Sequence, residues 1–372
     1  MNTITRTGVS LLSLAAVTVS MLEGQEVLSV RTDPACRSCE ITATRIVTLG
    51  DDSMALVGAT PTLQRDSRGR YYMTRDFDMA EILVLGADGD YITTLGRPGK
   101  GPGEYVAVNS IIVGAGDTIH VIDAGARRHT VLSPSYDVLR TTPIAYAPET
   151  NGVILLPNQK LLVHALSADP SAFGVPFHVL DSTGKVIRSF GGTNAQLDWE
   201  SLVPLTMRMI APSTRAGLFW AIRWRRYEPE LWDARNGELS KVLQREYRWF
   251  REELTAPQVT PPSAEMHGIW EDSKDRLWVI VWIPDQNWRK VRAAVGPDGE
   301  YYAPCDRSRV YDSSVAIFDS RTGRLIATDT FDAAFIPMRR GYFYSCRETD
   351  DGSPRIDVWQ LELATPTRGG NR

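Results

Sequence analysis

The chain has 372 residues, of which 43% are hydrophobic and 23% are charged, and its net charge at pH 7 is -4. This mildly acidic balance argues against nonspecific nucleic-acid binding, which needs a basic surface. A chain of this length could hold two or three ordinary domains, but the repeats described below run through nearly all of it and indicate one closed unit.

The chain begins with an apolar run, Val9 to Leu22, which follows a short start that carries Arg6. This run is too short to span a bilayer comfortably, but it suits the core of a secretory signal peptide. We therefore expect residues 1–24 to be a signal peptide that is cleaved between residues 20 and 25. The mature protein would then be exported to the periplasm or the extracellular medium and would have no transmembrane span. An uncleaved anchor is the alternative.

Residues 25–40 form a leader that contains the sequence Cys36-Arg37-Ser38-Cys39. The chain has four cysteines, and an even number in an exported protein favours disulfides. Three pairings are formally possible, and the most economical joins Cys36 to Cys39 and Cys305 to Cys346. A redox or metal role is disfavoured, because no histidine follows Cys39, no second such pair completes a zinc site and no βαβ pattern surrounds it.

Six copies of one pattern follow, each with a polar turn, a short apolar run, a looser stretch and a second apolar run that ends in a polar turn. The first halves are DSRGRYYM from Asp66, AGDTIHVID from Ala115, PNQKLLVHA from Pro157, TRAGLFWAI from Thr214, DSKDRLWVI from Asp272 and RGYFYSC from Arg340. The second halves begin at Glu81, His129, Phe177, Pro229, Val315 and Ile356. Self-similarity at roughly fifty residues, with only strand and turn signals, predicts an all-β six-bladed β-propeller of four-stranded antiparallel blades over residues 41–364.

The sixth copy ends near Leu363 and leaves no room for its fourth strand. The segment 41–50 ends in Ile46-Val47-Thr48-Leu49-Gly50 and matches the outer strands expected at 91–96 and 186–191. We therefore predict that this N-terminal strand closes the last blade, which removes free sheet edges. An insertion at 283–312 interrupts the fifth blade, and a disordered tail is expected at 365–372.

Between the first two copies the chain reads LGRPGKGPGEY, from Leu95 to Tyr105. The glycines allow positive φ in a cramped passage between blades, and a phosphate cradle is disfavoured because Lys100 is followed by Gly101 and no helix follows. With the six copies and the opening from Cys36 to VTLG, this segment resembles the exported bacterial six-bladed propellers, relatives of the NHL-repeat and TolB-like propellers. The resemblance implies a fold and a compartment but no particular activity.

In a propeller, the connections between blades share a face with the connections between the second and third strands. On this face we expect arginines and aromatic residues to line the mouth of the axial channel. The predicted ligand-binding residues are Arg75, Arg97, Arg223, Trp224, Arg225, Tyr227, Trp282 and Trp288, and Arg339 and Arg340 are further candidates.

A basic mouth lined by aromatic residues suits carboxylates, acidic glycans or peptides. The main hypothesis is therefore a monomeric binding module or interaction scaffold that takes a small molecule, a glycan or a protein, with no nucleic acid and no cofactor. The other interpretation is that these side chains pair with neighbouring acids or cap the edges of blades.

An enzyme is the second hypothesis. Sugar-lactonase propellers are similar to this chain in blade number and hold a divalent cation in the channel, which implies a metal-dependent hydrolase as the alternative. The candidate ligands for Ca²⁺ or Mg²⁺ are Glu104, Asn109, Glu265 and His267. A zinc site of three histidines, as in peptide-lyase propellers, is disfavoured because most of the histidines fall in or beside predicted strands. A serine hydrolase is disfavoured because no G-x-S-x-G sequence is present.

Overall fold

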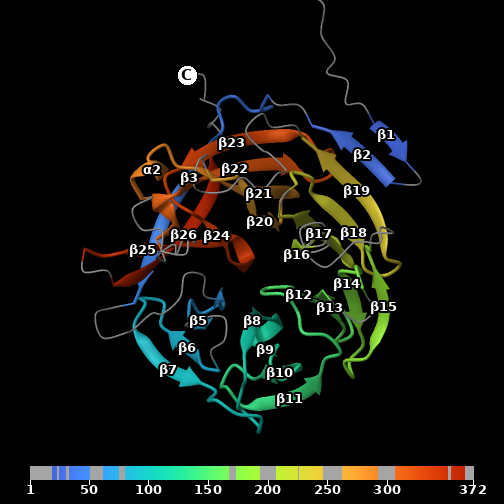
Figure 1. Cartoon of the computed structure of the whole chain (residues 1–372), viewed down its shortest axis with the longest axis vertical. Helices are drawn as coiled ribbons and strands as arrows, with labels where there is room; N and C mark the ends of the chain where they lie inside the picture. Colours follow the sequence, from blue (N-terminus) through green and yellow to red (C-terminus); the bar gives the residue numbers. More distant parts are fainter. Residues whose placement is uncertain are drawn as a thin grey trace, which may run out of the picture.

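The computed structural model describes residues 19–22, 25–30, 33–50, 62–74, 80–166, 173–192, 207–224, 226–245, 262–291, 306–350 and 353–364. Its strands form six sheets that stand around a central axis (Figure 1). Each sheet is a blade built on four antiparallel strands, so the chain is a six-bladed β-propeller. The fold predicted from the six sequence copies is confirmed.

The first three blades are made of consecutive strands, from the axis outward. Blade 1 has β4 (Leu63–Arg65), β5 (Tyr71–Thr74), β6 (Ile82–Leu85) and β7 (Tyr91–Leu95). Blade 2 has β8 (Val108–Val113), β9 (Ile119–Asp123), β10 (Arg128–Leu132) and β11 (Val138–Pro143), with the short η1 (Ala115–Asp117) after β8. Blade 3 has β12 (Val153–Leu155), β13 (Leu161–His164), β14 (Phe177–Leu180) and β15 (Val186–Phe190).

The last three blades carry the additions to the basic unit. Blade 4 has β16 (Arg208–Pro212), β17 (Leu218–Arg223), β18 (Glu230–Asp233) and β19 (Glu238–Gln244). Blade 5 has β20 (Glu265–Glu271), β21 (Arg276–Pro284), β22 (Tyr311–Asp319) and β23 (Leu325–Phe331), with α2 (Trp288–Val291) and η3 (Arg307–Arg309) between β21 and β22. Blade 6 has β24 (Ile336–Pro337), η4 (Arg339–Gly341), β25 (Tyr342–Glu348), β26 (Pro354–Ala364) and β3 (Glu40–Leu49).

The apolar runs that mark the sequence copies form the middle strands of the blades. Every residue from Leu277 to Trp282 in β21 is buried, and so is every residue of β6. The outer strand β7, by contrast, is exposed or half-buried along its whole length. A middle strand loses the alternation of polar and apolar residues because a neighbouring blade covers each of its faces.

The turn between the first and second strands repeats the same chemistry in blades 1 and 5. Asp66 accepts the Arg70 Nε–H at 2.7 Å, and Asp272 accepts the Arg276 Nε–H at 2.5 Å. The aromatic residue two positions after each arginine, a tyrosine in blade 1 and a tryptophan in blade 5, donates to the same carboxylate. The pattern Asp-Ser-x-x-Arg therefore fixes these turns through one carboxylate that accepts several hydrogen bonds.

The N-terminal strand closes the ring as predicted. β3 pairs antiparallel with β26, with Leu49 opposite Ile356 and Ile41 opposite Leu363. Leu49 is fully buried in the core between blades 6 and 1. The last blade is thus built from both ends of the propeller domain, and β26 has no free edge.

We predicted no strand in the leader, but the structure contains one. β2 (Gln25–Ser29) pairs parallel with the outer strand β19, and β1 (Val19–Leu22) pairs antiparallel with β2, so the sheet of blade 4 has six strands. Past β2, the backbone N–H groups of Ala35 and Cys36 donate to carbonyls in β23 of blade 5. The leader therefore runs along the outside of blades 4 and 5 before it enters blade 6 (Figure 1). β1 falls within the predicted signal peptide, so cleavage there would remove it.

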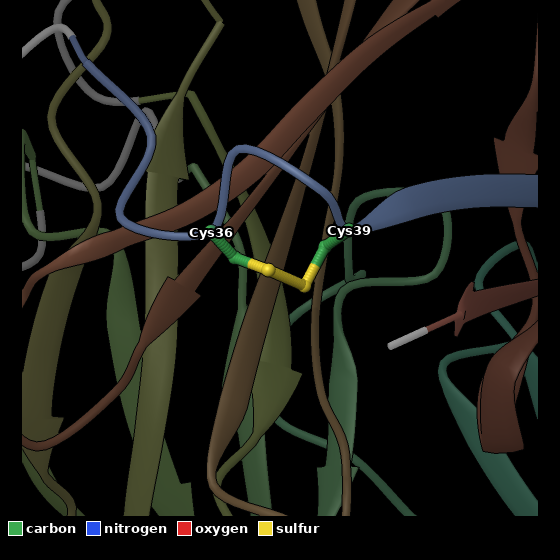
Figure 2. Close-up of a disulfide and its surroundings, with 2 residues drawn as sticks. All are labelled: Cys36 and Cys39. Carbon is green, nitrogen blue, oxygen red and sulfur yellow. A yellow bond between two sulfur atoms is a disulfide. The ribbon is translucent and has the colours of Figure 1, made fainter. Parts of the chain in front are cut away.

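The cysteine pair of the leader is a disulfide. Cys36 and Cys39 are joined, with their Cα atoms 5.4 Å apart, in the turn that leads into β3 (Figure 2). Cys346 is also disulfide-bonded. Its predicted partner, Cys305, lies outside the described residues.

The segment LGRPGKGPGEY forms a tight passage from blade 1 to blade 2. Gly96 has a φ of 81°, and a Cβ atom there would lie 2.5 Å from the ring of the buried Tyr105. Only glycine fits this position, which agrees with a structural role of the segment.

The predicted insertion in blade 5 begins and ends as paired strand, because Ile283 lies opposite Asp312 at the extended ends of β21 and β22. No helix in the described part of the chain is long and apolar enough to cross a membrane. Most of the predicted signal peptide and the whole predicted tail at 365–372 lie outside the described residues.

Candidate functional site in the axial cavity

A cavity of about 1000 Å³ lies on the propeller axis. The first strands of all six blades contribute to its wall. Their representatives in the wall are Gln64 of β4, Ile112 of β8, Val153 of β12, Ile210 of β16, Ile269 of β20 and Pro337 of β24. A volume of this size is in the range of small-molecule binding sites in proteins, about 300–1,000 Å³.

The turns between the first and second strands of blades 4, 5 and 6 also line the cavity, through Ser213 and Thr214, 272–274 and 338–341. Glu271 holds the blade 4 turn in place, because its Oε2 accepts hydrogen bonds from Ser213 Oγ at 2.5 Å and from the Thr214 N–H at 2.9 Å. The cavity therefore reaches the face of the propeller that carries these turns.

Two consecutive arginines of the blade 6 turn point across the axis. Arg339 donates a hydrogen bond to the carbonyl of Val153 in blade 3, which is three blades away in the ring. Arg340 donates to the carbonyl of Gly114 in blade 2 at 3.4 Å. Within the described residues, neither guanidinium forms an ion pair, and both line the cavity.

Burial lowers the pKa of Arg339 to about 10, and the nearby charge of Arg340 acts in the same direction. The guanidinium remains protonated at neutral pH. The side chain is half-buried, and it lines the cavity. The cavity thus contains a partly desolvated positive charge.

The backbone of this turn is held in an uncommon conformation. Arg340 has a φ of 66° and a ψ of 29°, which is the left-handed region that non-glycine residues seldom adopt. The next residue, Gly341, has a φ of 80°, and a Cβ atom there would lie 2.8 Å from the Trp270 ring. Such strain costs on the order of 1 kcal/mol or more and is concentrated at functional sites.

His267 lines the cavity, as Arg339 and Arg340 do, and it is the one predicted metal ligand in that lining. Its ring stacks on the Trp282 ring with centroids 3.4 Å apart and planes 12° apart. Its Nε2 lies 3.2 Å from Glu265 Oε2, so these two predicted metal ligands are neighbours. Trp282 itself is buried and donates to the Phe335 carbonyl at 2.9 Å.

The predicted basic residues of the other face are held by acids. The Arg97 guanidinium lies 2.9 Å from Glu104, and the Arg223 guanidinium lies 3.1 Å from Glu230. Glu230 also pairs with the buried Arg208 at 2.9 Å. Local sequence could not reveal these pairs, because each needs a strand or loop to be folded beside its neighbour.

The predicted aromatic residues are largely part of the core. Tyr227 is 5% exposed and packs between blades 4 and 5. Trp288 is half-buried in α2, with the Arg289 guanidinium 5.3 Å from its ring. The carbonyl of Trp224 accepts the Met266 N–H. Arg75 and Arg225 lie outside the described residues.

Arg339 and Arg340 were assigned to the wrong face. They lie in the turn that precedes the second strand of blade 6, between β24 and β25. Antiparallel strands alternate in direction, so the turn before the second strand lies at the opposite end of a blade from the turn after it. The signal for their correct position was present in the sequence, since the sixth copy begins at Arg340.

The other two predicted metal ligands have partners of their own. Glu104 accepts hydrogen bonds from the Gly101 N–H and from Arg97, which lower the pKa of its carboxyl group. Asn109 donates to the Pro148 carbonyl at 2.5 Å.

In the described part of the chain, one acidic group has oxygens close enough to hold a cation: Asp285, Asp312 and Asp332 lie within 4.8 Å of one another. They follow or begin β21, β22 and β23 and line a separate hollow of about 490 Å³ beside α2. Burial, with the charges of the other two carboxylates, raises the pKa of Asp312 to about 6. Oxygen donors of this kind suit Ca²⁺ or Mg²⁺. The pairing of Ile283 with Asp312 shows how strand register brings these acids together, which spacing along the chain could not.

Six closed blades around a lined axial cavity define the class of this protein, a six-bladed β-propeller with a ligand-sized channel. The chain belongs to the DUF5128 family, described as a 6-bladed beta-propeller, whose model matches residues 23–246. No curated protein is similar enough to count as a relative.

Two solved structures are similar over most of this chain. One is a Bacteroides fragilis protein named as exported, with 12% identity, a TM-score of 0.58 and coverage of 91% of this chain and 100% of that chain. The other is a member of the DUF4221 family from Bacteroides vulgatus, with 10% identity, a TM-score of 0.59 and coverage of 88% and 99%. At such identities the similarity concerns the fold alone.

Proposed function

We propose that this protein is an exported binding protein that takes a small ligand into its axial cavity. The observation that carries the proposal is the cavity itself, about 1000 Å³ in volume and walled by the first strands of all six blades. Pockets that combine apolar walls with a few polar groups are typical ligand sites. Here the polar groups include Arg339, Arg340 and His267.

Export is supported by three observations. The chain begins with a segment that has the pattern of a signal peptide. Its described cysteines are disulfide-bonded, and disulfides persist in oxidising compartments. A protein of similar fold is named as exported. These observations fit either the periplasm or the extracellular medium.

The predicted mouth of arginines and tryptophans is the less favoured location. Arg97 and Arg223 are paired with acids, although the Arg97 side chain is 74% exposed, and Tyr227 and Trp282 are buried. A protein partner on that face would have to displace these contacts. The cavity needs no such rearrangement.

A metal-dependent, lactonase-like hydrolase is the second candidate, and the contact between His267 and Glu265 beside the cavity is the observation in its favour. Such an enzyme needs several ligands on one ion. Glu104 is engaged by Arg97 instead, and Asn109 by a backbone carbonyl. We therefore place binding ahead of hydrolysis.

The test uses a substitution that fills part of the cavity. Ile210→Trp adds bulk to the cavity wall, while Ile187→Trp adds the same bulk at a half-exposed position on the outer strand β15. Ligands that raise the melting temperature of the mature wild-type protein would first be found in a thermal-shift screen. We expect Ile210→Trp to abolish the shift and Ile187→Trp to retain it. If both variants retain the shift, the ligand binds elsewhere and the proposal is wrong.

A further inference from the structure

The cavity is positively charged within an acidic protein. Its lining contains five arginine and lysine residues but three carboxylates, whereas the whole chain has a net charge of -4. Asp272 pairs with Arg276, whereas Glu271 and Glu362 accept hydrogen bonds from neutral groups and keep their negative charges. Glu230 lies outside this lining and pairs with Arg208, so five positive charges face four negative ones and a small positive excess remains.

Most of this excess resides in the blade 6 turn. Arg208 is neutralised by Glu230 and Arg276 by Asp272. Arg339 and Arg340, by contrast, donate only to backbone carbonyls within the described part of the protein. A carbonyl dipole satisfies a donor but leaves the net charge in place.

The positive charge of Arg340 helps to lower the pKa of the Asp117 carboxyl group. It forms no ion pair with that arginine, because its two oxygens accept hydrogen bonds from the N–H and the Oγ of Ser67. The larger part of the Asp117 shift comes from those hydrogen bonds.

A partly buried charge without a counterion is costly, and here that charge belongs to the half-buried Arg339, which lies beside the exposed Arg340. The same turn holds Arg340 in the left-handed region and brings Gly341 close to the Trp270 ring. An anion bound between the guanidinium groups would offset the cost. Guanidinium groups suit oxyanions in particular, since their planar fork can donate two parallel hydrogen bonds.

We propose that Arg339 and Arg340 form an anion-recognition site in the axial cavity, which selects small ligands that carry a carboxylate or another oxyanion. This inference rests on the proposed function, because it assumes that the ligand enters the cavity. It adds the chemical class of the ligand and the residues that select it.

The experiment compares the acid and the neutral member of matched pairs, such as galacturonate and galactose, together with citrate and inorganic phosphate. Dissociation constants are measured by calorimetry on the mature protein, on Arg339→Gln and on Arg188→Gln. Arg188 is the matched control, because it also donates to a backbone carbonyl, that of Asn236, but lies on the outer strand β15. Comparing carboxylates with phosphate shows which oxyanion the site prefers.

We expect the wild-type protein and Arg188→Gln to bind acids and to ignore the neutral partners. Arg339→Gln should bind the same acids at least tenfold more weakly, and added salt should weaken wild-type binding. If Arg339→Gln binds an acid as tightly as the wild-type protein, or if no acid binds the wild-type protein, the anion site is wrong.

Melting of the apo variants gives a second readout that does not need a ligand. If Arg339 serves to bind anions, Arg339→Gln should melt at the same temperature as the wild-type protein or higher, because it removes an uncompensated charge. A clearly lower melting temperature would instead show that Arg339 holds blades 6 and 3 together, and would overturn the inference.

The two proposals fail separately. If a neutral ligand loses binding in Ile210→Trp but binds Arg339→Gln as it binds the wild-type protein, the cavity proposal is supported and the anion site is wrong. If Ile210→Trp does not change the affinity for any ligand, the cavity proposal itself is wrong.

Discussion

Two regions beside the axis place pairs of arginines in different electrostatic surroundings. In blade 4, Arg208 and Arg223 share the carboxylate of Glu230, at 2.9 and 3.1 Å. In blade 6, Arg339 and Arg340 have only backbone carbonyls as partners within the described residues. The first arrangement neutralises its charges within the fold, while the second leaves charges that the described part of the chain does not neutralise. The presence of an arginine therefore says less about function than whether the fold supplies its counterion.

A pair of histidines in blade 2 shows a third way in which the fold accommodates a buried titratable group. His120 Nδ1 and His129 Nε2 are 2.9 Å apart in blade 2, and burial lowers the pKa of the first to about 4 and of the second to about 3. The charges of Arg140 and Arg339 add to the shift of His120. These two side chains avoid a buried charge by losing the proton, which an arginine cannot do at neutral pH.

The largest effect is expected when the shared counterion in blade 4 is removed. Glu230→Ala removes the carboxylate that pairs with Arg208, whose side chain is 3% exposed. We expect the free energy of unfolding to fall by about 3–5 kcal/mol, as for other broken buried ion pairs.

Chemical denaturation at pH 7 measures this loss. The control is Glu104→Ala, which removes the partner of an arginine whose side chain is 74% exposed, and we expect little change there. Equal losses in both variants would contradict the contrast between buried and exposed pairs.

The next effect concerns acidification. His120 and His129 have lower pKa values in the folded state than the ordinary value of 6.5, so the unfolded chain takes up protons first as the pH falls. The stability contributed by the neutral pair is complete above pH 6.5 and is lost as the pH falls towards about 4. The loss should be on the order of 3 kcal/mol for the coupled pair.

Denaturation curves of the wild-type protein and of His129→Gln between pH 7.5 and 4.5 test this expectation. The variant should lose stability less steeply than the wild-type protein over this range. Parallel curves would mean that the histidine pair does not titrate as its burial implies.

A smaller effect should follow from the strained turn in blade 6. Gly341→Ala places a Cβ atom 2.8 Å from the Trp270 ring at a φ of 80°, so we expect a loss of about 1–2 kcal/mol and weaker anion binding. Arg340→Gly should instead raise stability by up to about 1 kcal/mol, since glycine adopts the left-handed region freely. Melting temperatures measure both changes, and a stabilising Gly341→Ala would contradict the backbone argument.

The smallest effect is expected at Asp312, in the group of three aspartates beside α2. Asp312 has a pKa of about 6 in the folded state, above the ordinary value of 3.8, so the folded state binds the proton more tightly. Stability contributed by the protonated form is complete below pH 3.8 and is lost as the pH rises through about 6. After allowance for solvent screening, Asp312→Asn should stabilise the protein on the order of 1 kcal/mol at pH 7.5 and little at pH 4.5.

Melting curves at the two pH values, in buffer with EDTA, measure this difference. If the three aspartates hold a cation, Ca²⁺ should raise the melting temperature of the wild-type protein at pH 7.5 and so remove the difference from Asp312→Asn. Stabilisation that is equal at both pH values would contradict the raised pKa of Asp312.

Local sequence was sufficient for most of the fold. The buried strands β6 and β21 are recognisable in the sequence as continuous apolar segments between turn residues. The pattern of residues 41–50 matches that of the outer strands of other blades. The disulfide between Cys36 and Cys39 also follows from proximity along the chain. The strand β2 escaped prediction, because its parallel pairing with β19 joins segments more than two hundred residues apart and leaves no local pattern.

The candidate site could be predicted only in part. His267 was among the predicted residues and lines the cavity, while Arg223 and Arg97 turned out to be ion-paired. Arg339 and Arg340 were singled out but assigned to the opposite face. The acidic group around Asp312 was missed entirely, since its members come from the ends of three neighbouring strands.

The sequence by itself determined the number of blades, the strand that closes the ring and one disulfide, because these depend on apolar periodicity, turn chemistry and short separations along the chain. Only the tertiary structure decided which charges are neutralised. An arginine finds its counterion on a strand or loop that folding brings alongside, as Arg208 finds Glu230. Among the described residues, Arg339 instead meets the carbonyl of Val153 on the far side of the axis.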